Sequence, residues 1–481
     1  MNNNDIVQKL WSFCNILRDD GITFHQYVNE LTYLLFLKMA EETSIEGELP
    51  KGFRWADLAS LSGLAQFDFY RNQLVVLGTR GSDSVRSIFA NPTSLLRHAE
   101  SLNMLVSRID DLDWYSAKKE GLGDLYEGLL QKNASEKKSG AGQYFTPRVL
   151  IDSIVDLMRP TLSDVIQDPA AGTGGFLVAA NQYILNHSNP SRWTRIQRNK
   201  YHKKTFFGME HVQDAHRLAL MNLLLHGIGY EIGGVGIQYG DTLGVQGAEL
   251  AAKGATLVMT NPPFGTKRGS GLPSRTDLTY PTSNKQLCFL QHVSKTLVNG
   301  GRAAVVVPDN VLFEGNISAD IRHDLLETCD LHTILRLPTG IFYAQGVKTN
   351  VLFFNQGQMD HGNTKSVWIY DMRTNTPQFG KRTYLTRDHF AAFEKTFGED
   401  PLGHSKRKDE GVTGRFRKFS RKQISDRHDN LDIFWLKDDN RANDHDLPEP
   451  SILAQSIINE IEAAMDEMRL LLIDLGEEEE A

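Results

Sequence analysis

The sequence predicts an α/β protein with a helical N-terminal domain, a doubly wound parallel sheet and a long C-terminal helix. From about residue 140, short β-rich runs alternate with helical stretches of about 10–15 residues, which is typical of a parallel sheet covered on both faces. Residues 1–135 instead carry apolar residues at three- and four-residue spacing, the period of a helix. Residues 451–475 repeat that spacing over about seven turns.

The composition is that of a globular protein with two or three domains. The chain has 481 residues, of which 40% are hydrophobic, enough to bury a core. Its three cysteines, Cys14, Cys288 and Cys329, are far apart, so we expect reduced thiols in a cytoplasmic protein and no metal site. The polar start MNNND lacks the features of a signal peptide, and the apolar run YLLFLKMA is too short to span a membrane.

The net charge of −8 argues against a chain that binds long DNA by itself, because phosphate contacts need Lys and Arg. Local basic patches, or a partner subunit that supplies most of the grip, remain compatible with this charge.

The N-terminal domain, residues 1–135, is expected to be helical throughout. Its clearest apolar pattern covers residues 28–43, and residues 109–134 are typical of helical segments with breaks at Gly121 and Gly123.

The sheet is expected in a catalytic domain over residues 136–400. Predicted strands end at Asp168, Glu210, Thr260 and Pro308, and further β-rich runs cover residues 331–338 and 350–356. Ligands of such sheets bind beyond the carboxyl ends of the strands, so residues at these ends are the candidates for a site.

The last two segments differ in charge and pattern. Residues 401–450 are expected to form a basic linker, whose stretch 404–422 is either a solvated loop or a nucleic-acid contact. Residues 451–481 are expected to form an amphipathic helix that packs on its own chain or, as we favour, serves subunit assembly.

The stretch Asn261-Pro262-Pro263-Phe264 directly follows one predicted strand, residues 255–260. Two prolines continue neither a strand nor a helix, because they lack an N–H and fix φ, so the chain must turn rigidly. This turn suits an aminated base, whose NH2 group can donate to Asn261 and a backbone carbonyl while Phe264 stacks on the ring. Taken alone, the motif is also compatible with an ordinary surface loop.

A glycine-rich turn, DPAAGTGGF at residues 168–176, follows another predicted strand. Gly172, Gly174 and Gly175 allow a sharp turn and a close approach of the backbone to a ligand. The following helix offers free N–H groups to a carboxylate or phosphate. The spacing is neither that of a dinucleotide fingerprint nor that of a P-loop.

Two acids lie near further strand ends. Glu210 could accept hydrogen bonds from two ribose hydroxyls, and Asp241 in YGDTL could bind an adenine amino group. Each alone could be a helix cap or a surface carboxylate, but their order between the glycine turn and NPPF favours an adenosyl pocket. Upstream, GAGQYFTPR at residues 140–148 supplies Tyr144 and Phe145 as a second wall.

In this order, GQYFTPR, DPAAGTGGF, GMEH, GDTL and NPPF resemble the motifs of S-adenosylmethionine-dependent DNA adenine methyltransferases, which have a Rossmann-like sheet. With the helical front domain and the segment at residues 286–315, the chain is similar to the modification subunit of type I restriction–modification systems. The resemblance covers nearly the whole chain, from about Leu10 to the C-terminal helix.

The resemblance implies a site-specific DNA adenine methyltransferase that protects host DNA from restriction. It implies that Asn261, Pro262, Pro263 and Phe264 hold the target adenine, that Glu210 holds the cofactor ribose, and that Asp168 positions the methionine end. The full set expected to bind S-adenosylmethionine is Gln143, Tyr144, Phe145, Thr146, Pro147, Arg148, Asp168, Gly172, Thr173, Gly174, Gly175, Glu210 and Asp241.

The resemblance also implies partners. Sequence recognition in double-stranded DNA belongs to a separate specificity subunit, usually joined by two modification subunits, and a restriction subunit may join these.

Two other functions remain open from the residues alone. NPP-aromatic turns also serve methylation of cytosine and of glutamine side chains, and a scaffold that binds cofactor without turnover would keep the same pocket. The loop at residues 265–285 closes over the extruded base, contacts phosphate through Lys267, Arg268 and Arg275, or is an ordinary surface loop.

Overall fold

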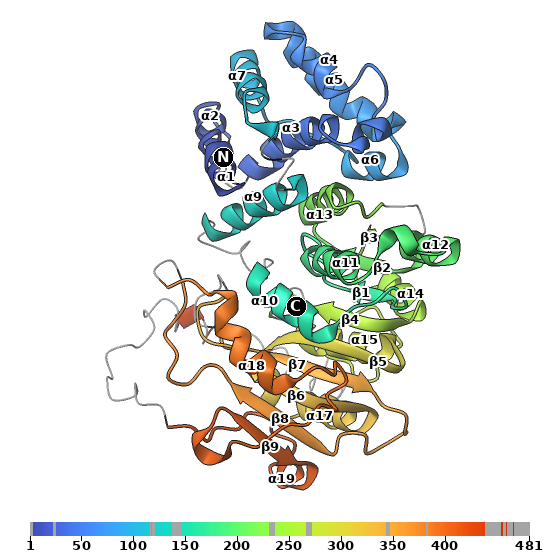
Figure 1. Cartoon of the computed structure of the whole chain (residues 1–481), viewed down its shortest axis with the longest axis vertical. Coiled ribbons are helices and arrows are strands. Elements are labelled where there is room, and N and C mark those ends of the chain that lie inside the picture. The colour runs from blue at the N-terminus through green and yellow to red at the C-terminus, as the bar shows by residue number, and fades with distance from the viewer. Residues whose placement is uncertain are drawn as a thin grey trace, which may run out of the picture. The chain divides into compact units, whose positions relative to one another are not determined.

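The computed structural model describes residues 3–22, 26–115, 117, 121–136, 146–229, 236–265, 272–342, 347–380, 383–437 and four positions of the C-terminal segment, 454, 455, 458 and 465. The chain forms two compact units (Figure 1). The first unit combines Met1–Phe145 with Ala171–Tyr239, and the second combines Thr146–Ala170 with Gly240–Ala481. The domain boundaries expected from the sequence stay a prediction.

The N-terminal part of the first unit is helical, as predicted. Its elements are α1 (Asn3–Ser12), α2 (Cys14–Asp19), α3 (Tyr27–Glu41), η2 (Ser44–Glu48), α4 (Trp55–Ala59), α5 (Gly63–Arg80), α6 (Asp83–Ile88), α7 (Ala99–Asp110) and α9 (Leu122–Glu136). Helix α3 is the centre of this part, because it contacts α2, α4, α7 and α9 and its residues 31–40 are all buried.

The rest of the first unit contains strands. Its elements are α11 (Gly175–His187), η4 (Pro190–Arg192), α12 (Arg195–Lys204), β2 (Phe206–Glu210), α13 (Gln213–Leu225) and β3 (Gly236–Tyr239). Strands β2 and β3 pair in parallel, with Glu210 opposite Tyr239. Helix α13 contacts both strands as well as α3, α6 and α9, so the helical part and the strands share one core.

The second unit holds a mixed sheet in the order β1-β4-β5-β7-β6-β8-β9. The strands are β1 (Ile166–Asp168), β4 (Ala255–Thr260), β5 (Leu297–Pro308), β6 (Cys329–Arg336), β7 (Thr349–Gln356), β8 (Ser366–Asp371) and β9 (Phe416–Ser420). The helices are α10 (Arg148–Met158), α14 (Val245–Ala252), α15 (Lys285–Thr296), α16 (Asn310–Phe313), α17 (Ile317–Thr328), η5 (Arg387–Phe390), α18 (Ala391–Phe397), η6 (Gly411–Thr413) and α19 (Arg421–Ser425). Helices α10, α15 and α17 pack on its central strands (Figure 1).

The α/β fold class is confirmed, but the sheet is not parallel throughout. Strand β7 runs antiparallel to both of its neighbours, β5 and β6, and β9 runs antiparallel to β8. A parallel return from β6 would need a helical crossover, and the described residues of the connection at 337–348 contain no helix. The sequence pattern of a buried strand is the same for both directions, so it could not reveal this reversal.

The core of the second unit follows from these strands. Val305 of β5 and Leu352 and Phe354 of β7 are at most 1% exposed, and continuous apolar runs of this kind are typical of strands covered on both faces. Arg302 of β5 forms a buried ion pair with Asp164, which precedes β1, with 2.9 Å between Nη1 and Oδ1. Burial alone would raise the pKa of Asp164, but the hydrogen bonds and charge of Arg302 outweigh it and hold this pKa below its ordinary value.

The segment expected to be a basic linker is folded in its described part, because it contributes β9 and α19. Arg407 donates to Thr333 Oγ1 (2.9 Å) and its guanidinium lies over the Phe397 ring, while Arg421 pairs with Glu327 and Asp429. These two arginines therefore serve packing within the unit rather than a solvated loop or a nucleic-acid contact.

The remaining expectations concern the C-terminus, the thiols and membranes. The predicted helix at 451–481 lies outside the described residues except for Ala454, Gln455, Ile458 and Met465, which are helical and exposed. All three cysteines are buried and none forms a disulfide among the described residues. Among the described residues, no helix has both the length and the apolar composition that crossing a membrane requires.

Candidate active site

The amide of Asn261 lies at the carboxyl end of β4, where the chain leaves the strand. Its Nδ2 donates a hydrogen bond to Thr146 Oγ1 (3.0 Å), which fixes the side chain. Its Oδ1 is buried and has no hydrogen-bond partner in the described part of the chain. A buried acceptor without a partner destabilises the fold by about 1–3 kcal/mol. A ligand that donates a hydrogen bond to Oδ1 removes this cost on binding.

Phe264 ends the same turn and keeps part of its surface exposed. Its ring packs edge to face on Phe342, with 6.3 Å between centroids and an interplanar angle of 76°. Phe342 is itself buried. The pair thus offers a supported aromatic surface near an unpaired amide oxygen, the combination that an amino-substituted ring requires.

Asp168 at the end of β1 is tied to the end of β4. Its Oδ1 accepts hydrogen bonds from Thr260 Oγ1 (2.7 Å) and from the Ala170 amide (3.1 Å). Both Asp168 and Thr260 are almost completely buried. This carboxylate therefore fixes the two strand ends from which the glycine turn and the NPPF turn begin.

The glycine turn has the backbone conformation that its composition predicts. Gly172 and Gly174 have φ of 54° and 81°, in the left-handed region that favours glycine. At Gly174 a Cβ would lie 2.6 Å from Leu223 Cδ1 of α13, so no larger residue fits without displacement. Helix α11 begins at the next residue, Gly175, and the first N–H groups of a helix have no acceptor within it.

Glu210 at the end of β2 is bound to this turn. Its Oε2 accepts from the Gly172 amide (2.8 Å) and its Oε1 from the Val212 amide (2.7 Å). Burial raises the pKa of Glu210, although these N–H donors favour its charged form. Each carboxylate oxygen has more than one acceptor position, so these two contacts leave capacity for the two ribose hydroxyls expected from the sequence.

Asp241 and Thr242 follow β3 in the chain and belong to the second unit. Asp241 Oδ1 accepts from the Leu243 amide (2.9 Å), and Thr242 Oγ1 donates to the Pro169 carbonyl (2.6 Å). Thr242 therefore connects the GDTL segment to the start of DPAAGTGGF, a role that the sequence reasoning missed.

Arg275 was one of three residues that could contact DNA phosphate, and its burial contradicts that alternative. Its side chain is 0% exposed; it donates to the Thr242 carbonyl (3.1 Å) and contacts Asp277 and His292. Burial, together with the charge of Arg275, lowers the pKa of His292 to about 3, so this histidine is neutral and accepts the hydrogen bond. Lys267 and Arg268 lie outside the described residues.

The upstream motif is described only from Thr146. Pro147 caps α10, and Arg148 Nε donates to Asp152 Oδ1 (2.8 Å) within that helix. The other three expected cofactor contacts, Gln143, Tyr144 and Phe145, lie outside the described residues.

The predicted site residues thus fall into two described sets. In the second unit, hydrogen bonds connect Thr146 to Asn261 and Asp168 to Thr260. In the first unit, the Gly172–Gly175 turn is bound to Glu210, and the Thr173 carbonyl accepts from Asn222 Nδ2 (3.0 Å). Sequence reasoning missed Asn222, Thr242 and Thr146's contact to Asn261, because their partners are distant in the chain.

Two family models match the chain. The model of N-6 DNA methylases matches residues 117–442, and the model of the HsdM N-terminal domain matches residues 6–52.

Curated relatives match over the full length. The chain is 48% identical to the type I restriction enzyme StySPI methylase subunit of Salmonella potsdam and 49% identical to the StySJI methylase subunit of Salmonella typhimurium. Each alignment covers 100% of this chain and 97% of the relative.

Solved structures agree with this match. The crystal structure of the EcoKI M protein is 44% identical, with a TM-score of 0.59 over 99% of this chain and 97% of that one. A modification subunit of a type I enzyme from Vibrio vulnificus is 25% identical, with a TM-score of 0.70 over 90% and 97% of the two chains.

Proposed function

Because the chain belongs to the family of N-6 DNA methylases and matches type I methylase subunits over its full length, we propose that Asn261 is the centre of a DNA adenine methylation site. The chain is an adenine-specific DNA methyltransferase and the modification subunit of a type I restriction–modification enzyme. The family match decides among the amines left open by the sequence: it favours adenine over cytosine and glutamine.

The observation that carries the proposal is the buried, unpaired Oδ1 of Asn261. Methyltransferases of this family depend on S-adenosylmethionine, which supplies an electrophilic methyl group on a sulfonium. Asn261 Oδ1 accepts one N–H of the adenine amino group and the Pro262 carbonyl accepts the other. In this orientation Thr146 accepts from Nδ2, which leaves Oδ1 as the end of the amide that is available to the base.

These two acceptors make the amine a better nucleophile. In free adenine the N6 lone pair is delocalised into the ring; two N–H acceptors outside the ring plane favour a pyramidal nitrogen and direct the lone pair toward the methyl group. Bound S-adenosylmethionine would supply the methyl group: the C–N bond would form as the C–S bond breaks, the electron pair would stay on sulfur, and the nitrogen would then lose a proton. The site acts by positioning and by stabilising the positive charge that develops on nitrogen, without a covalent enzyme intermediate.

Phe264 stacks on the adenine. A base must leave the duplex to reach such a turn, which costs a few kcal/mol, and aromatic stacking of about 1–3 kcal/mol offsets part of that. Phe342, which supports the Phe264 ring edge to face, keeps this surface in place.

The cofactor contacts form the second part of the proposal. In the first unit, Glu210 accepts from the ribose hydroxyls, and Gly172, Thr173, Gly174 and Gly175 let the backbone approach the ligand. In the second unit, Asp168 positions the methionine end and Asp241 binds the adenine amino group of the cofactor. Residues 143–148 complete the set.

The partners are also proposed. The chain assembles with a specificity subunit, two copies to one, on double-stranded DNA, and a restriction subunit joins in a host that has one. Relatives named as type I methylase subunits and the acidic net charge of −8 support a separate chain as the main DNA reader.

The proposal is tested with Asn261→Ala in the purified complex with its specificity subunit. We expect methyl transfer to DNA to fall by at least about 100-fold, the effect of removing one preorganised charge-stabilising group, with unchanged affinity for S-adenosylmethionine. Asn103→Ala is the matched control, because Asn103 is exposed on α7 and far in sequence from any motif. Full transfer by Asn261→Ala would contradict the role of this residue.

A further inference from the structure

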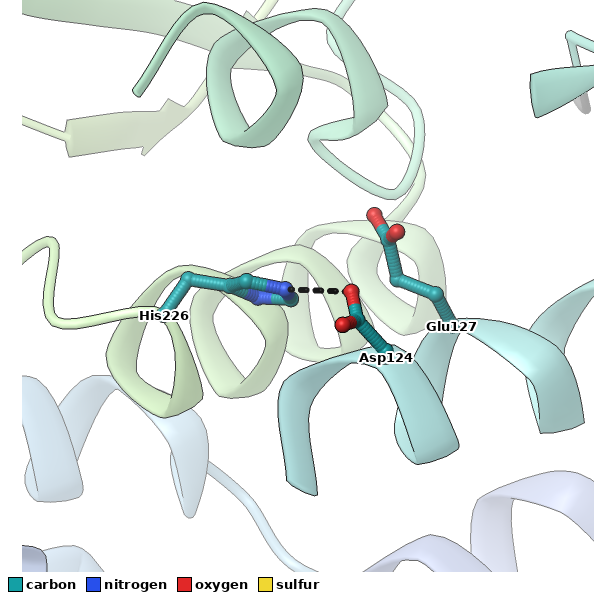
Figure 2. Close-up of side chains that lie close together, drawn as sticks. All are labelled: Asp124, Glu127 and His226. Atoms are coloured by element: carbon teal, nitrogen blue, oxygen red, sulfur yellow. Dashed lines mark ion pairs between the residues drawn. The ribbon is translucent and has the colours of Figure 1, made fainter. Parts of the chain in front are cut away.

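Three side chains with metal-binding atoms and no role assigned above gather in the first unit. Asp124 and Glu127 lie one turn apart on α9, and His226 follows α13 (Figure 2). One ligand atom of each lies within 4.8 Å of those of the other two. We propose that these residues bind a divalent transition-metal ion such as Zn2+, contrary to the expectation from the cysteine pattern.

His226 is the reason to propose an ion rather than an acidic cluster. Its side chain is 7% exposed, and its Nε2 has no hydrogen-bond partner within the described residues. Its Nδ1 lies 2.8 Å from the Asn222 carbonyl, an acceptor, so Nδ1 carries the proton. That tautomer leaves a lone pair on Nε2, as in metal-binding histidines whose other nitrogen donates to a carbonyl.

The lone pair of Nε2 faces another acceptor. Asp124 Oδ1 lies 3.7 Å away, in the direction that the ring points (Figure 2). Two acceptors that face each other repel unless a cation lies between them. This 3.7 Å separation is wider than a direct hydrogen bond of about 2.7–3.2 Å and is compatible with a metal ion between the two atoms.

The position of the His226 ring depends on a glycine in the opposite helix. At Gly123 of α9, a Cβ would lie 2.5 Å from both Cε1 and Nε2 of His226. Glycine weakens a helix, yet here it is what allows the ring to lie against α9 beside the two carboxylates.

The ligand chemistry suits a transition metal more than Mg2+ or Ca2+, because one ligand is an imidazole. Zn2+ binds His nitrogen and carboxylate oxygen at about 2.0–2.2 Å, so two ligands of one ion are at most about 4.3 Å apart. The ligand atoms must therefore move closer to one another by a few tenths of an ångström when the ion binds. Asp124 is exposed and Glu127 partly exposed, so both have room to do so, and water completes the coordination.

Neighbouring amides orient both carboxylates. Gln182 Nε2 donates to Asp124 Oδ1 (3.1 Å), and Asn222 Nδ2 donates to Glu127 Oε1 (3.3 Å) as well as to the Thr173 carbonyl. Asn222 thus connects a metal ligand to the glycine turn within the first unit. A bound ion would hold α9, the end of α13 and this turn in one arrangement.

The test is metal binding by the untagged, full-length protein after treatment with a chelator. We expect one equivalent of Zn2+ by calorimetry, a raised Tm with Zn2+, and visible absorption bands when Co2+ replaces it. Asp124→Asn and Glu127→Gln keep the shape of each side chain and should each weaken Zn2+ binding by at least about tenfold.

The matched control is His404→Gln. His404 and Asp400 form an exposed histidine–carboxylate pair at 3.3 Å that belongs to no three-residue ligand group in the described part of the chain. This variant should bind Zn2+ like the wild type. A wild-type protein that takes up no stoichiometric Zn2+, or Asp124→Asn and Glu127→Gln variants that bind as tightly as wild type, would overturn the proposal and leave His226 and Asp124 as a simple ion pair.

Discussion

At the residue scale, the two ends of one amide are treated differently. Asn261 Nδ2 is held by Thr146, whereas Oδ1 is buried without a partner in the described part of the chain. The unpaired acceptor at the end of β4 lowers the stability of the folded protein. Such an acceptor is expected of a binding site and not of a surface loop.

The raised pKa of Glu210 predicts how the affinity for S-adenosylmethionine depends on pH. Since burial raises its pKa, Glu210 becomes protonated at a higher pH than an ordinary glutamate and then loses acceptor capacity for the ribose. We expect the affinity for S-adenosylmethionine to weaken as pH falls toward this raised pKa. Glu210→Gln should bind more weakly at neutral pH, by about 1–3 kcal/mol, and show a flatter pH profile. If calorimetric titrations show the same pH dependence of cofactor affinity in the wild type and in Glu210→Gln, the ribose assignment is refuted.

Single residues also show the limit of sequence reasoning. Asp168, Glu210 and Asn261 could be proposed from the sequence because each ends or directly follows a recognisable strand. Arg275 could not be interpreted correctly, because its partners Thr242 and His292 come together only in the folded unit. A basic residue in a Gly- and Ser-rich segment has the same local pattern whether it is buried or exposed.

At the scale of elements, the glycine turn depends on its approach to α13. Gly174→Ala introduces both a strained φ and an overlap with Leu223, and we expect it to destabilise the protein by about 2–4 kcal/mol and to impair cofactor binding. Gly315→Ala is the matched control, since its Cβ would meet nothing within 4 Å. Equal unfolding midpoints and cofactor affinities for the two variants would contradict this role.

The Asp164–Arg302 pair joins the segment before β1 to β5. Because the folded-state pKa of Asp164 is lowered, its ionised form stabilises the protein above its unfolded pKa of about 3.9, and this stabilisation is lost as pH falls through the folded value. Asp164→Asn should therefore cost about 3–5 kcal/mol in urea unfolding at pH 7, and the difference from wild type should narrow in acid.

The control for that experiment is Asp83→Asn, which removes the exposed pair with Arg86 and should cost less than about 1 kcal/mol. A similar loss of unfolding free energy in both variants would mean that burial does not determine the contribution of the Asp164 pair to stability.

Elements were predicted with uneven success. Strand–helix alternation identified the strands that position the site, because their apolar runs and the turns after them are local features. The direction of β7 and the pairing of β9 with β8 depend on contacts between distant segments, which no local pattern encodes.

At the scale of the whole molecule, the account predicts a subunit of a larger enzyme. Removing residues 451–481 should leave binding of S-adenosylmethionine intact and impair assembly with the specificity subunit, as measured by size-exclusion chromatography with light scattering. Full assembly of the shortened chain would exclude the C-terminal segment as the docking element.

The most direct test of the central claim is a genome-wide map of methylated bases in the native host, with Asn261→Ala in place of the wild-type residue. The account predicts loss of N6-methyladenine at one recognition sequence and its return when the wild-type chain is supplied. An unchanged map, or loss of methylated cytosine instead, would contradict the assignment of Asn261 to adenine methylation.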